Sequence, residues 1–348
     1  MPVHHIALCC ALSLLDEIAA AAPLPLFEEE QPLQAVLSAP LGQVYAQRRK
    51  DDRLYFPGFW SYNDNNGEKQ RLSVQIRTRG IYRRLNCRLP PLQLNFKKSE
   101  VKGTLFKGQD KLKLVGPCGT RSRDDQFLIL EYLAYRAFDL VADGHSFDTR
   151  MIELSYVDTE QKEKPWTDMT FVIEDEDDLA KRLGRILMKV PKIDSSQLDP
   201  VQSTVVELFQ YMIGNTDYST IRAAAGLDCC HNVKLMALKD SREGIIPVPY
   251  DFDSSGIVDA PYAKPSETIP IRSVRKRFYT GRCRDPSFLD NAIARYIENR
   301  AAIIALFRDS EYLEDRYKKK TVSYLEEFFE VINDPAKVER ELSSRCRG

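Results

Sequence analysis

Residues Phe209 to Asp253 read FQYMIGNTDYSTIRAAAGLDCCHNVKLMALKDSREGIIPVPYDFD, with three apolar runs that each begin or end at an acidic or amide side chain. Asp217 follows the first run, Asn232 precedes the second, and Asp251 and Asp253 follow the third. Transfer of a phosphoryl group from ATP uses such a set: one carboxylate orients the attacking hydroxyl, and an Asn and an Asp hold Mg²⁺ against the phosphates. Magnesium prefers hard oxygen ligands and usually takes one or two carboxylates from the protein.

An alternative interpretation of this stretch is three ordinary turns. Asp and Asn are common turn residues, and GNTD, LDCCHN and YDFD could each be a plain connection between strands. The order Asp, Asn, Asp, together with the flanking strand-like runs VKLMAL and IIPVPY, favours a functional interpretation.

The composition is that of a soluble globular protein. The chain has 348 residues, of which 43% are hydrophobic and 29% charged, and this is enough for two domains. A net charge of −1 gives no overall signature of nucleic-acid or membrane binding, so we expect no nucleic-acid partner. Arginines and lysines cluster locally at 77–88 and 272–277, either as a solvated face or as a contact for phosphate.

Residues 1–22 resemble a secretory signal peptide. The apolar run IALCCALSLL, at Ile6 to Leu15, is too short to span a membrane, and small residues before Pro23 resemble a cleavage site. Asp16 and Glu17 interrupt this pattern, so a cytoplasmic chain remains an alternative. We expect export to the periplasm or the extracellular space, and no membrane span in the mature chain.

Six cysteines follow that segment: Cys87, Cys118, Cys229, Cys230, Cys283 and Cys346. Their spacing does not match a zinc site, and disulfides are expected in an exported protein. We predict a bridge between Cys87 and Cys118, and a second bridge from Cys229 or Cys230 to Cys283.

Local patterns predict a β-rich part followed by a helical part. Residues 23–106 alternate short apolar and polar stretches, with a hairpin turn at DNNGE, and predict antiparallel strands. Further strands are predicted for KLKLV (Lys111 to Val115), 147–157 and 166–173. Helices are predicted for 126–142, for the segment EDEDDLAKRLG, for Pro200 to about Ile213 with Asp199 as its N-cap, and within 286–348.

Taken in order, these segments resemble the spore-coat protein H (CotH) kinase-like family, a distant branch of the protein-kinase-like superfamily. The matching motifs are RTRG, PPLQLNFKK, KLKLV, LEYLAYRAF, MTFVIEDEDDLAKRLG, FQYMIGNTD, HNVKLM and PVPYDFD. The resemblance implies an α+β fold, in which a β-rich N-terminal region precedes a two-lobed protein-kinase-like domain with a helical C-terminal part. The implied divisions are a β-rich module at 23–106, a kinase-like core at 107–285 with a hinge near 171–176 and catalytic loops at 214–253, and C-terminal helices at 286–348.

The resemblance also implies a role for each polar residue of the opening stretch. Asp217 would be the catalytic carboxylate. Asn232 and Asp251 would hold Mg²⁺ or Mn²⁺, and Asp253 could assist a second metal ion. His231 receives no catalytic role, because a lone histidine is weak evidence.

For the nucleotide, the resemblance points to the first half of the chain. Lys113 would contact the phosphates of ATP and would be held by an ion pair with Glu131. Lys111 is the alternative, because alternate residues of a strand point the same way. Glu174 and Asp175 would lie near the adenine or ribose.

The predicted function is therefore transfer of phosphate from a nucleotide to a protein or small hydroxyl acceptor. Two alternatives stay open, and departures from the family pattern bear on the first of them. The chain lacks a glycine-rich loop before KLKLV, and DFD stands where ordinary kinases have DFG. The alternatives are a non-catalytic binding or envelope structural protein, and a metal-dependent phosphohydrolase that uses Asp217, Asp251 and Asp253.

Overall fold

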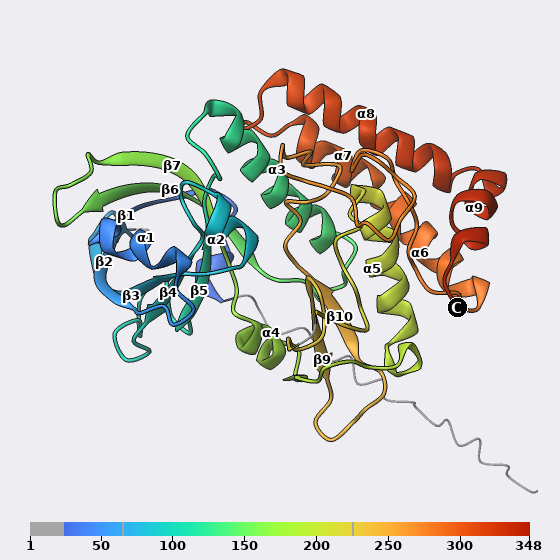
Figure 1. The fold of residues 1–348 in the computed structure, drawn as a ribbon, viewed down its shortest axis with the longest axis horizontal. Helices are drawn as coiled ribbons and strands as arrows, with labels where there is room; N and C mark the ends of the chain where they lie inside the picture. The colour runs from blue at the N-terminus through green and yellow to red at the C-terminus, as the bar shows by residue number, and fades with distance from the viewer. Residues whose placement is uncertain (1–23, 65, 225) are drawn as a thin grey trace, which may run out of the picture.

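A closed barrel of seven strands forms the N-terminal half of the fold (Figure 1). The computed structural model describes residues 24–64, 66–224 and 226–348. The barrel strands are β1 (Leu33–Ala39), β2 (Phe56–Asn63), β3 (Lys69–Thr78), β4 (Leu92–Phe96), β5 (Lys111–Val115), β6 (Thr149–Asp158) and β7 (Trp166–Ile173). Their order around the barrel is β1-β2-β3-β4-β5-β7-β6. All neighbours are antiparallel except β1 and β6, whose parallel pairing closes the barrel.

Alternation of side chains explains why these segments form a barrel. In β3 the residues Leu72, Val74 and Ile76 are buried, whereas the residues between them are exposed. Because successive side chains of a strand point to opposite faces, the apolar set fills the interior. Trp60 and Phe106 pack edge to face within it, with ring centroids 5.9 Å apart.

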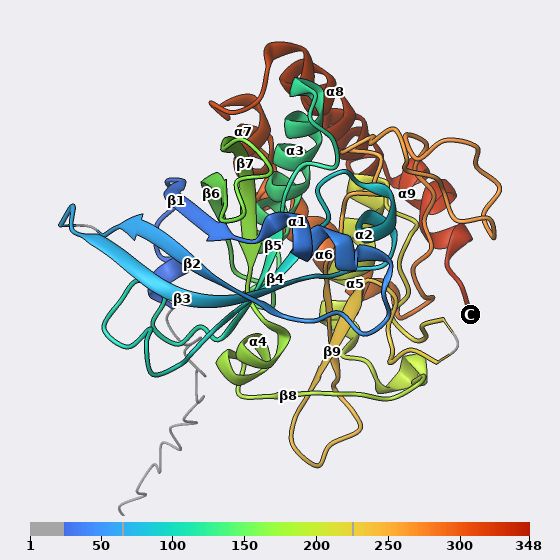
Figure 2. The same cartoon turned by 60° about the vertical axis from the view of Figure 1, so that its left-hand side comes forward.

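One long helix packs between the barrel and the rest of the molecule. The connections from β1 to β5 hold the short helices α1 (Leu41–Ala46) and α2 (Tyr82–Asn86), and α3 (Ser122–Asp139) follows β5. Helix α3 packs against β6 and β7 on one side and against α7 (Arg300–Arg308) on the other (Figure 2). Eleven of its residues are buried, so it lies in a core shared by both sides.

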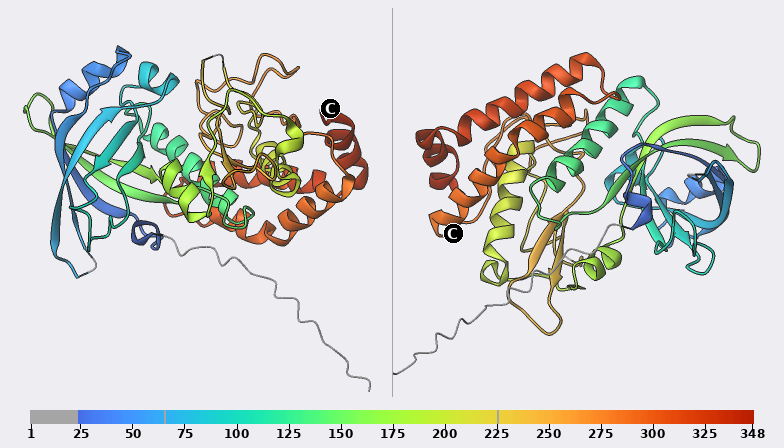
Figure 3. Two further views of the ribbon diagram at one scale, coloured as in Figure 1. Left: turned by 90° about the horizontal axis from the view of Figure 1, so that it is seen from below. Right: turned by 180° about the vertical axis from the view of Figure 1, so that it is seen from behind.

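The second half combines a small sheet with helices. Its three strands, in the order β10-β9-β8, are β8 (Ile186–Leu187), β9 (Val233–Ala237) and β10 (Ile246–Pro249). The helices are α4 (Glu176–Arg182), α5 (Pro200–Ile213), α6 (Pro286–Glu298), α7, α8 (Asp315–Ile332) and α9 (Pro335–Glu341). Figure 3 shows the barrel and the C-terminal helices at opposite ends of the molecule, with α5 and the small sheet between them.

The expected two-lobed protein-kinase-like fold is wrong. The β-rich segments form one closed seven-stranded barrel, and the helices lie mostly C-terminal to it. The predicted β-rich module at 23–106 supplies four of the strands, and β5, β6 and β7 complete the same barrel. Only the mixed α+β composition of the prediction is loosely compatible with the structure. The error arose because the order of elements along a chain does not determine which strands pair, and β1 pairs with the distant β6.

Many individual elements were predicted correctly. Helix α5 begins at Pro200 and ends at Ile213, and the Asp199 side chain accepts a hydrogen bond from the Gln202 N–H at 2.7 Å. Strands β5, β6 and β7 and the C-terminal helices also lie at or near their predicted positions. Strong local patterns and an acidic N-cap before a proline are sufficient for such predictions.

The disulfide prediction is half correct. Cys87 and Cys118 are bonded as predicted. The predicted bridge to Cys283 is wrong, because Cys229 is bonded to its neighbour Cys230, and Cys283 to Cys346. Residues 1–22, predicted as a signal peptide, lie outside the described residues. Within the described ranges, no helix has the length and apolar character needed to cross a membrane.

Candidate functional site

A cavity of about 460 Å³ lies where the end of β3, helix α3 and the loops around β9 and β10 meet. It brings together five of the predicted site residues: Glu131, Asp217, Asn232, Asp251 and Asp253. The other two, Lys113 and Glu174, do not line it. Residues far apart in the sequence therefore converge on one cavity, as the order of polar residues in the sequence suggested.

Asp217 is held on the loop that follows α5. The helix ends at Gly214, whose φ of 66° turns the chain out of the helix. The Asp217 N–H then donates a hydrogen bond to the Asn215 side chain at 2.9 Å. Asn232 donates from Nδ2 to both the backbone oxygen of Asp217, at 2.8 Å, and its carboxylate, at 3.1 Å. The Asp217 side chain remains 41% exposed, so a ligand can reach it.

His231 is a site residue to which sequence reasoning assigned no role. Its Nε2 lies 2.7 Å from Oδ1 of Asp217, and this hydrogen bond raises the pKa of His231 despite partial burial. The imidazole therefore orients the carboxylate and is protonated more readily than a free histidine. The position of His231 directly before Asn232 was the available indication in the sequence.

Asp251 and Asp253 follow β10 and line the same cavity. Asp251 adopts a φ of 66°, and its backbone N–H donates a hydrogen bond to Tyr135 Oη at 2.8 Å. Burial, together with the charge of Asp253, raises the pKa of Asp251 to about 6. The Asp253 carboxylate accepts a hydrogen bond from Tyr262 Oη at 2.9 Å. The two acids thus form a buried acidic pair that a cation would stabilise.

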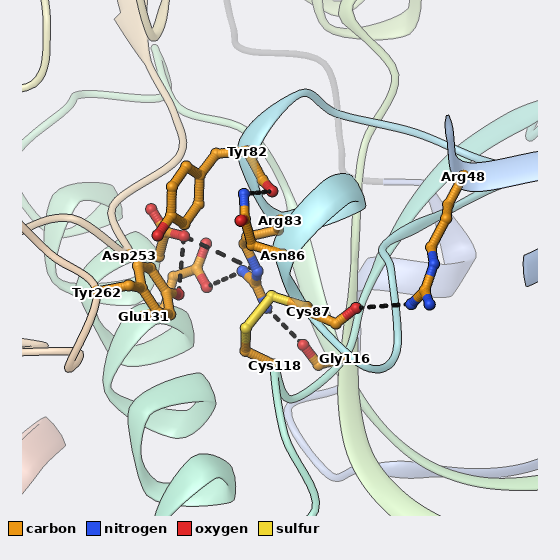
Figure 4. The surroundings of a disulfide bond; sticks show 10 residues. All are labelled: Arg48, Tyr82, Arg83, Asn86, Cys87, Gly116, Cys118, Glu131, Asp253 and Tyr262. Carbon is orange, nitrogen blue, oxygen red and sulfur yellow. Dashed lines mark hydrogen bonds and ion pairs between the residues drawn. A yellow bond between two sulfur atoms is a disulfide. The ribbon is translucent and has the colours of Figure 1, made fainter. Parts of the chain in front are cut away.

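The expected ion pair between Lys113 and Glu131 is wrong. Glu131 pairs instead with Arg83 of α2, with Nη1 to Oε2 at 2.8 Å, and Arg83 Nε also lies 3.8 Å from Asp253 (Figure 4). Both side chains of the Arg83–Glu131 pair are almost fully buried, and burial raises the pKa of Glu131. Glu131 therefore stabilises Arg83 next to the acidic pair.

Lys113 is buried beside the cavity, in a cluster with Glu176 and Lys234. Its ammonium group pairs with Glu176 at the start of α4, and Lys234 Nζ lies 3.7 Å from the other oxygen of that carboxylate. Burial would raise the pKa of Glu176, but Lys113 and Lys234 outweigh it and lower this pKa to about 2. Lys111, the alternative, is exposed on the same strand. Lys234, which the sequence did not single out, also lines the cavity.

Glu174 is fully buried and serves as a structural anchor. Arg182 donates to both of its carboxylate oxygens, at 3.1 and 2.8 Å, and the Asp148 N–H adds a third contact at 3.2 Å. These bonds join the end of β7 to α4. The side chain therefore has no open surface for a nucleotide.

The donor set suits a hard divalent cation. Asp251, Asp253 and the amide of Asn232 offer oxygen atoms, and Mg²⁺ typically combines one or two carboxylates with water and substrate phosphates. Across the described part of the chain, no group of three or more His, Cys, Asp or Glu side chains could hold a metal ion. A magnesium ion here would therefore depend on phosphate oxygens for part of its coordination. Arg79, on the same cavity, and Lys234 add positive charge for such phosphates.

Comparison with known proteins adds no identification. No protein-family model matches the chain, and no curated protein matches it either. The resemblance to the spore-coat protein H kinase-like family therefore remains a prediction from the order of motifs.

Proposed function

We propose that this protein transfers a phosphoryl group from ATP, with Mg²⁺ or Mn²⁺, to a hydroxyl group of a protein or small-molecule acceptor. The observation that supports it is the convergence of Asp217, Asn232 and Asp251 from three separate loops on one cavity. The proposal rests on the chemistry of these side chains and not on any kinase fold.

In this proposal one group of residues accepts the proton, and another binds the charged metal ion and phosphates. Asp217 accepts the proton of the acceptor hydroxyl at a carboxylate oxygen, and His231 and Asn232 fix its orientation. Asp251 and Asn232 would hold the metal ion, which when bound would neutralise charge on the phosphates. Arg79 and Lys234 would bind phosphate oxygens and orient the donor.

One set of contacts favours the non-catalytic alternative. Glu131 is paired with Arg83 and Lys113 with Glu176. The lysine predicted to contact the phosphates and the glutamate predicted to hold that lysine therefore have other partners. A binding protein that retains the cavity without transferring phosphate would tolerate this arrangement.

Nucleotide binding provides the first test. The full chain is melted with ATP, with and without Mg²⁺ or Mn²⁺, beside the variants Asp251→Ala and Asp228→Ala. Asp228 is an exposed carboxylate on the same cavity and serves as the matched control. A ligand that binds only the folded state raises stability by roughly a few kcal/mol at saturating excess.

We expect a metal-dependent rise in melting temperature that is lost in Asp251→Ala and kept in Asp228→Ala. If ATP shifts neither protein with any metal, the phosphotransferase proposal fails. If ATP binds but no phosphate is transferred to any hydroxyl acceptor, the non-catalytic alternative replaces it.

We also propose that the protein is exported. The bonded pairs Cys87–Cys118 and Cys283–Cys346 support this, because disulfides persist in oxidising compartments. Fractionation of cells that produce the full chain tests it, and recovery of the protein with the cytoplasmic fraction would contradict it.

A further inference from the structure

A second, larger cavity of about 960 Å³ lies on the barrel, outside the candidate functional site. It is bordered by the segment after α1, the turn between β6 and β7, and the segment after α2. Its cationic side chains are Arg48, Arg49, Arg88, Lys162 and Lys164, against two carboxylates, Glu163 and Asp168. This excess of positive charge contrasts with the net charge of −1 of the whole chain.

Several of these cations are available to a ligand. Lys162 pairs with Glu160 at 3.2 Å. In the described ranges, no ion pair connects Arg49, Arg88 or Lys164 to a carboxylate, and all three side chains are exposed. Surface cations without carboxylate partners provide electrostatic attraction for an anionic chain.

The floor of this cavity is aromatic and firmly held. The Trp166 ring stacks on Tyr156, with centroids 4.8 Å apart and an angle of 11° between the ring planes. Its Nε1 donates a hydrogen bond to Asp168 at 2.9 Å. Tyr45 and Leu89 line the same floor. An apolar surface below a cationic rim suits a ligand that combines negative charge with an apolar side chain.

A neighbouring cavity extends this surface toward the candidate functional site. It measures about 450 Å³ and shares Arg88 and Thr120 with the larger cavity. It adds Arg121 and Arg123, with one carboxylate, Asp124. Its far wall is Tyr262, whose hydroxyl binds Asp253 and whose ring lies 5.5 Å from that of Tyr82.

Figure 4 shows the side chains around the Cys87–Cys118 disulfide. Arg48 lies on one side of the disulfide, and Tyr262 and Asp253 lie on the other. Cys118 lines the smaller cavity. We call the two cavities together the basic groove.

We infer that the basic groove binds an acidic segment of a polypeptide. Acidic side chains would meet the unpaired cations, and an apolar side chain would rest on Trp166 and Tyr45. The floor includes the aliphatic Leu89 as well as the rings of Trp166 and Tyr45. This mixed surface suits an aliphatic peptide side chain better than the face of a sugar ring, which stacks mainly on aromatic rings. Because the groove leads to Tyr262 beside Asp253, the bound polypeptide is the phosphate acceptor; this last step alone rests on the function proposed above.

Binding can be tested without any transfer reaction. The probe is a short fluorescein-labelled peptide of alternating glutamate and serine with one leucine, and fluorescence anisotropy is measured on the full chain without nucleotide. The groove variant carries Arg49→Glu, Arg88→Glu and Lys164→Glu. The matched control carries Lys102→Glu, Lys107→Glu and Lys319→Glu, which change the net charge equally at exposed positions away from the groove.

We expect the groove variant to bind the peptide at least about tenfold more weakly, and the control to bind it almost as tightly as the unsubstituted protein. If the triple variant does not fold, the single change Lys164→Glu on an exposed turn replaces it. This variant should also bind the peptide more weakly, but by a smaller factor.

Equal weakening in both triple variants would overturn the inference, because only net charge would then matter. Binding of a heparin-derived oligosaccharide without binding of the peptide would also overturn it and indicate an anionic glycan. If Asp217→Asn abolishes transfer but leaves peptide binding intact, both proposals are supported. If the peptide binds but phosphate is never transferred, the inference that the groove binds acidic peptides is retained and the phosphotransferase proposal fails.

Discussion

Asp217 is the residue on which the proposed chemistry depends most directly. Its carboxylate is partly exposed and is oriented by His231 and Asn232. Replacement by asparagine removes the proton acceptor and keeps the size, so Asp217→Asn should lower the rate of phosphate transfer by about 10²- to 10⁴-fold. Because the side chain is not packed in the core, the melting temperature should change little.

Initial rates with labelled ATP and the acidic serine peptide measure this effect, and thermal melting followed by circular dichroism checks the fold. Asp228→Asn is the matched control, since it removes an exposed carboxylate from the same cavity. A similar loss of rate in both variants would show that Asp217 has no special role.

Asp251 gives a pH-dependent prediction. Its pKa rises from 3.8 to about 6 in the folded protein because of burial and the neighbouring Asp253, while Arg83 and Arg79 oppose the rise. The folded state therefore binds this proton more tightly than the unfolded state does. The resulting stabilisation is fully present below about pH 4 and is lost as the pH rises through about 6.

Asp251→Asn should remove the loss of stability that accompanies ionisation of Asp251, because asparagine is neutral at every pH. Without metal, the variant should gain stability relative to the unsubstituted protein between about pH 4 and pH 7, on the order of 2 kcal/mol. Urea unfolding in the presence of a chelator measures the difference, with Asp228→Asn as the control. A difference that stays constant over this pH range would contradict the acidic pair.

Single residues also show what the sequence could not provide. The residue types and their order indicated the cavity around Asp217, Asn232 and Asp251. The partners of Lys113 and Glu131 were not predictable, because they depend on where the fold places α2 and α4. Arg83 was visible only as one arginine in a basic cluster, and its buried pairing with Glu131 arises from contacts distant in sequence.

Among the elements, α5 and its C-terminal end position the site. Gly214 ends the helix with φ of 66°, and a Cβ atom there would lie 3.0 Å from the backbone oxygen of Val274 and against the hydroxyl of Tyr324. Gly214→Ala should therefore combine backbone strain with a steric clash. We expect a loss of about 2 to 4 kcal/mol in stability and a lower transfer rate, because Asp217 lies on the next turn of chain.

Gly184→Ala is the matched control for this prediction. Gly184 follows α4 with φ of 61°, and a Cβ atom there would meet nothing within 4 Å. Only backbone strain remains, so the expected loss is about 1 kcal/mol with little effect on transfer. Urea unfolding and rate measurements compare the two variants. Equal losses would mean that the contacts of Gly214 do not matter.

Elements with strong local patterns were predictable, and α5 is the clearest case. An acidic N-cap, a proline at the first helical position and an apolar run determine its bounds, because capping and apolar periodicity act within a few residues. The same holds for β5, whose five residues KLKLV were predicted without error. The pairing of β5 with β7 was not visible, since strand partners are selected by tertiary packing.

At the scale of the whole molecule, closure of the barrel is the feature that sequence reasoning missed. Strand β1 pairs with β2 on one edge and with β6 on the other, and the second pairing is parallel. Parallel pairs require a long connection and leave no turn signature in the sequence. The order of strands and helices therefore suggested two lobes, although the strands close on one another.

The Cys283–Cys346 bridge constrains the largest part of the helical half. The two cysteines are 63 positions apart in the sequence, and the loop that they close contains α6, α7, α8 and α9. The Cys283 N–H also donates to the Arg347 oxygen at 3.0 Å, so the chain end is held at the start of this helical region. A crosslink over such a loop stabilises the fold by about 4 kcal/mol, mainly by restricting the unfolded chain.

The double variant Cys283→Ser/Cys346→Ser should therefore lose about 4 kcal/mol of unfolding free energy under oxidising conditions. The comparison variant is Cys87→Ser/Cys118→Ser, which opens a loop of 31 residues and should lose nearly as much, because the entropy grows only slowly with loop length. Urea unfolding with and without reductant measures both. Each double variant should respond less to reductant than the unsubstituted protein does, because one bridge is already absent. If the Cys283→Ser/Cys346→Ser variant unfolds like the unsubstituted protein in oxidising buffer, this bridge does not contribute to the folded protein, and the helical half must be held by packing alone.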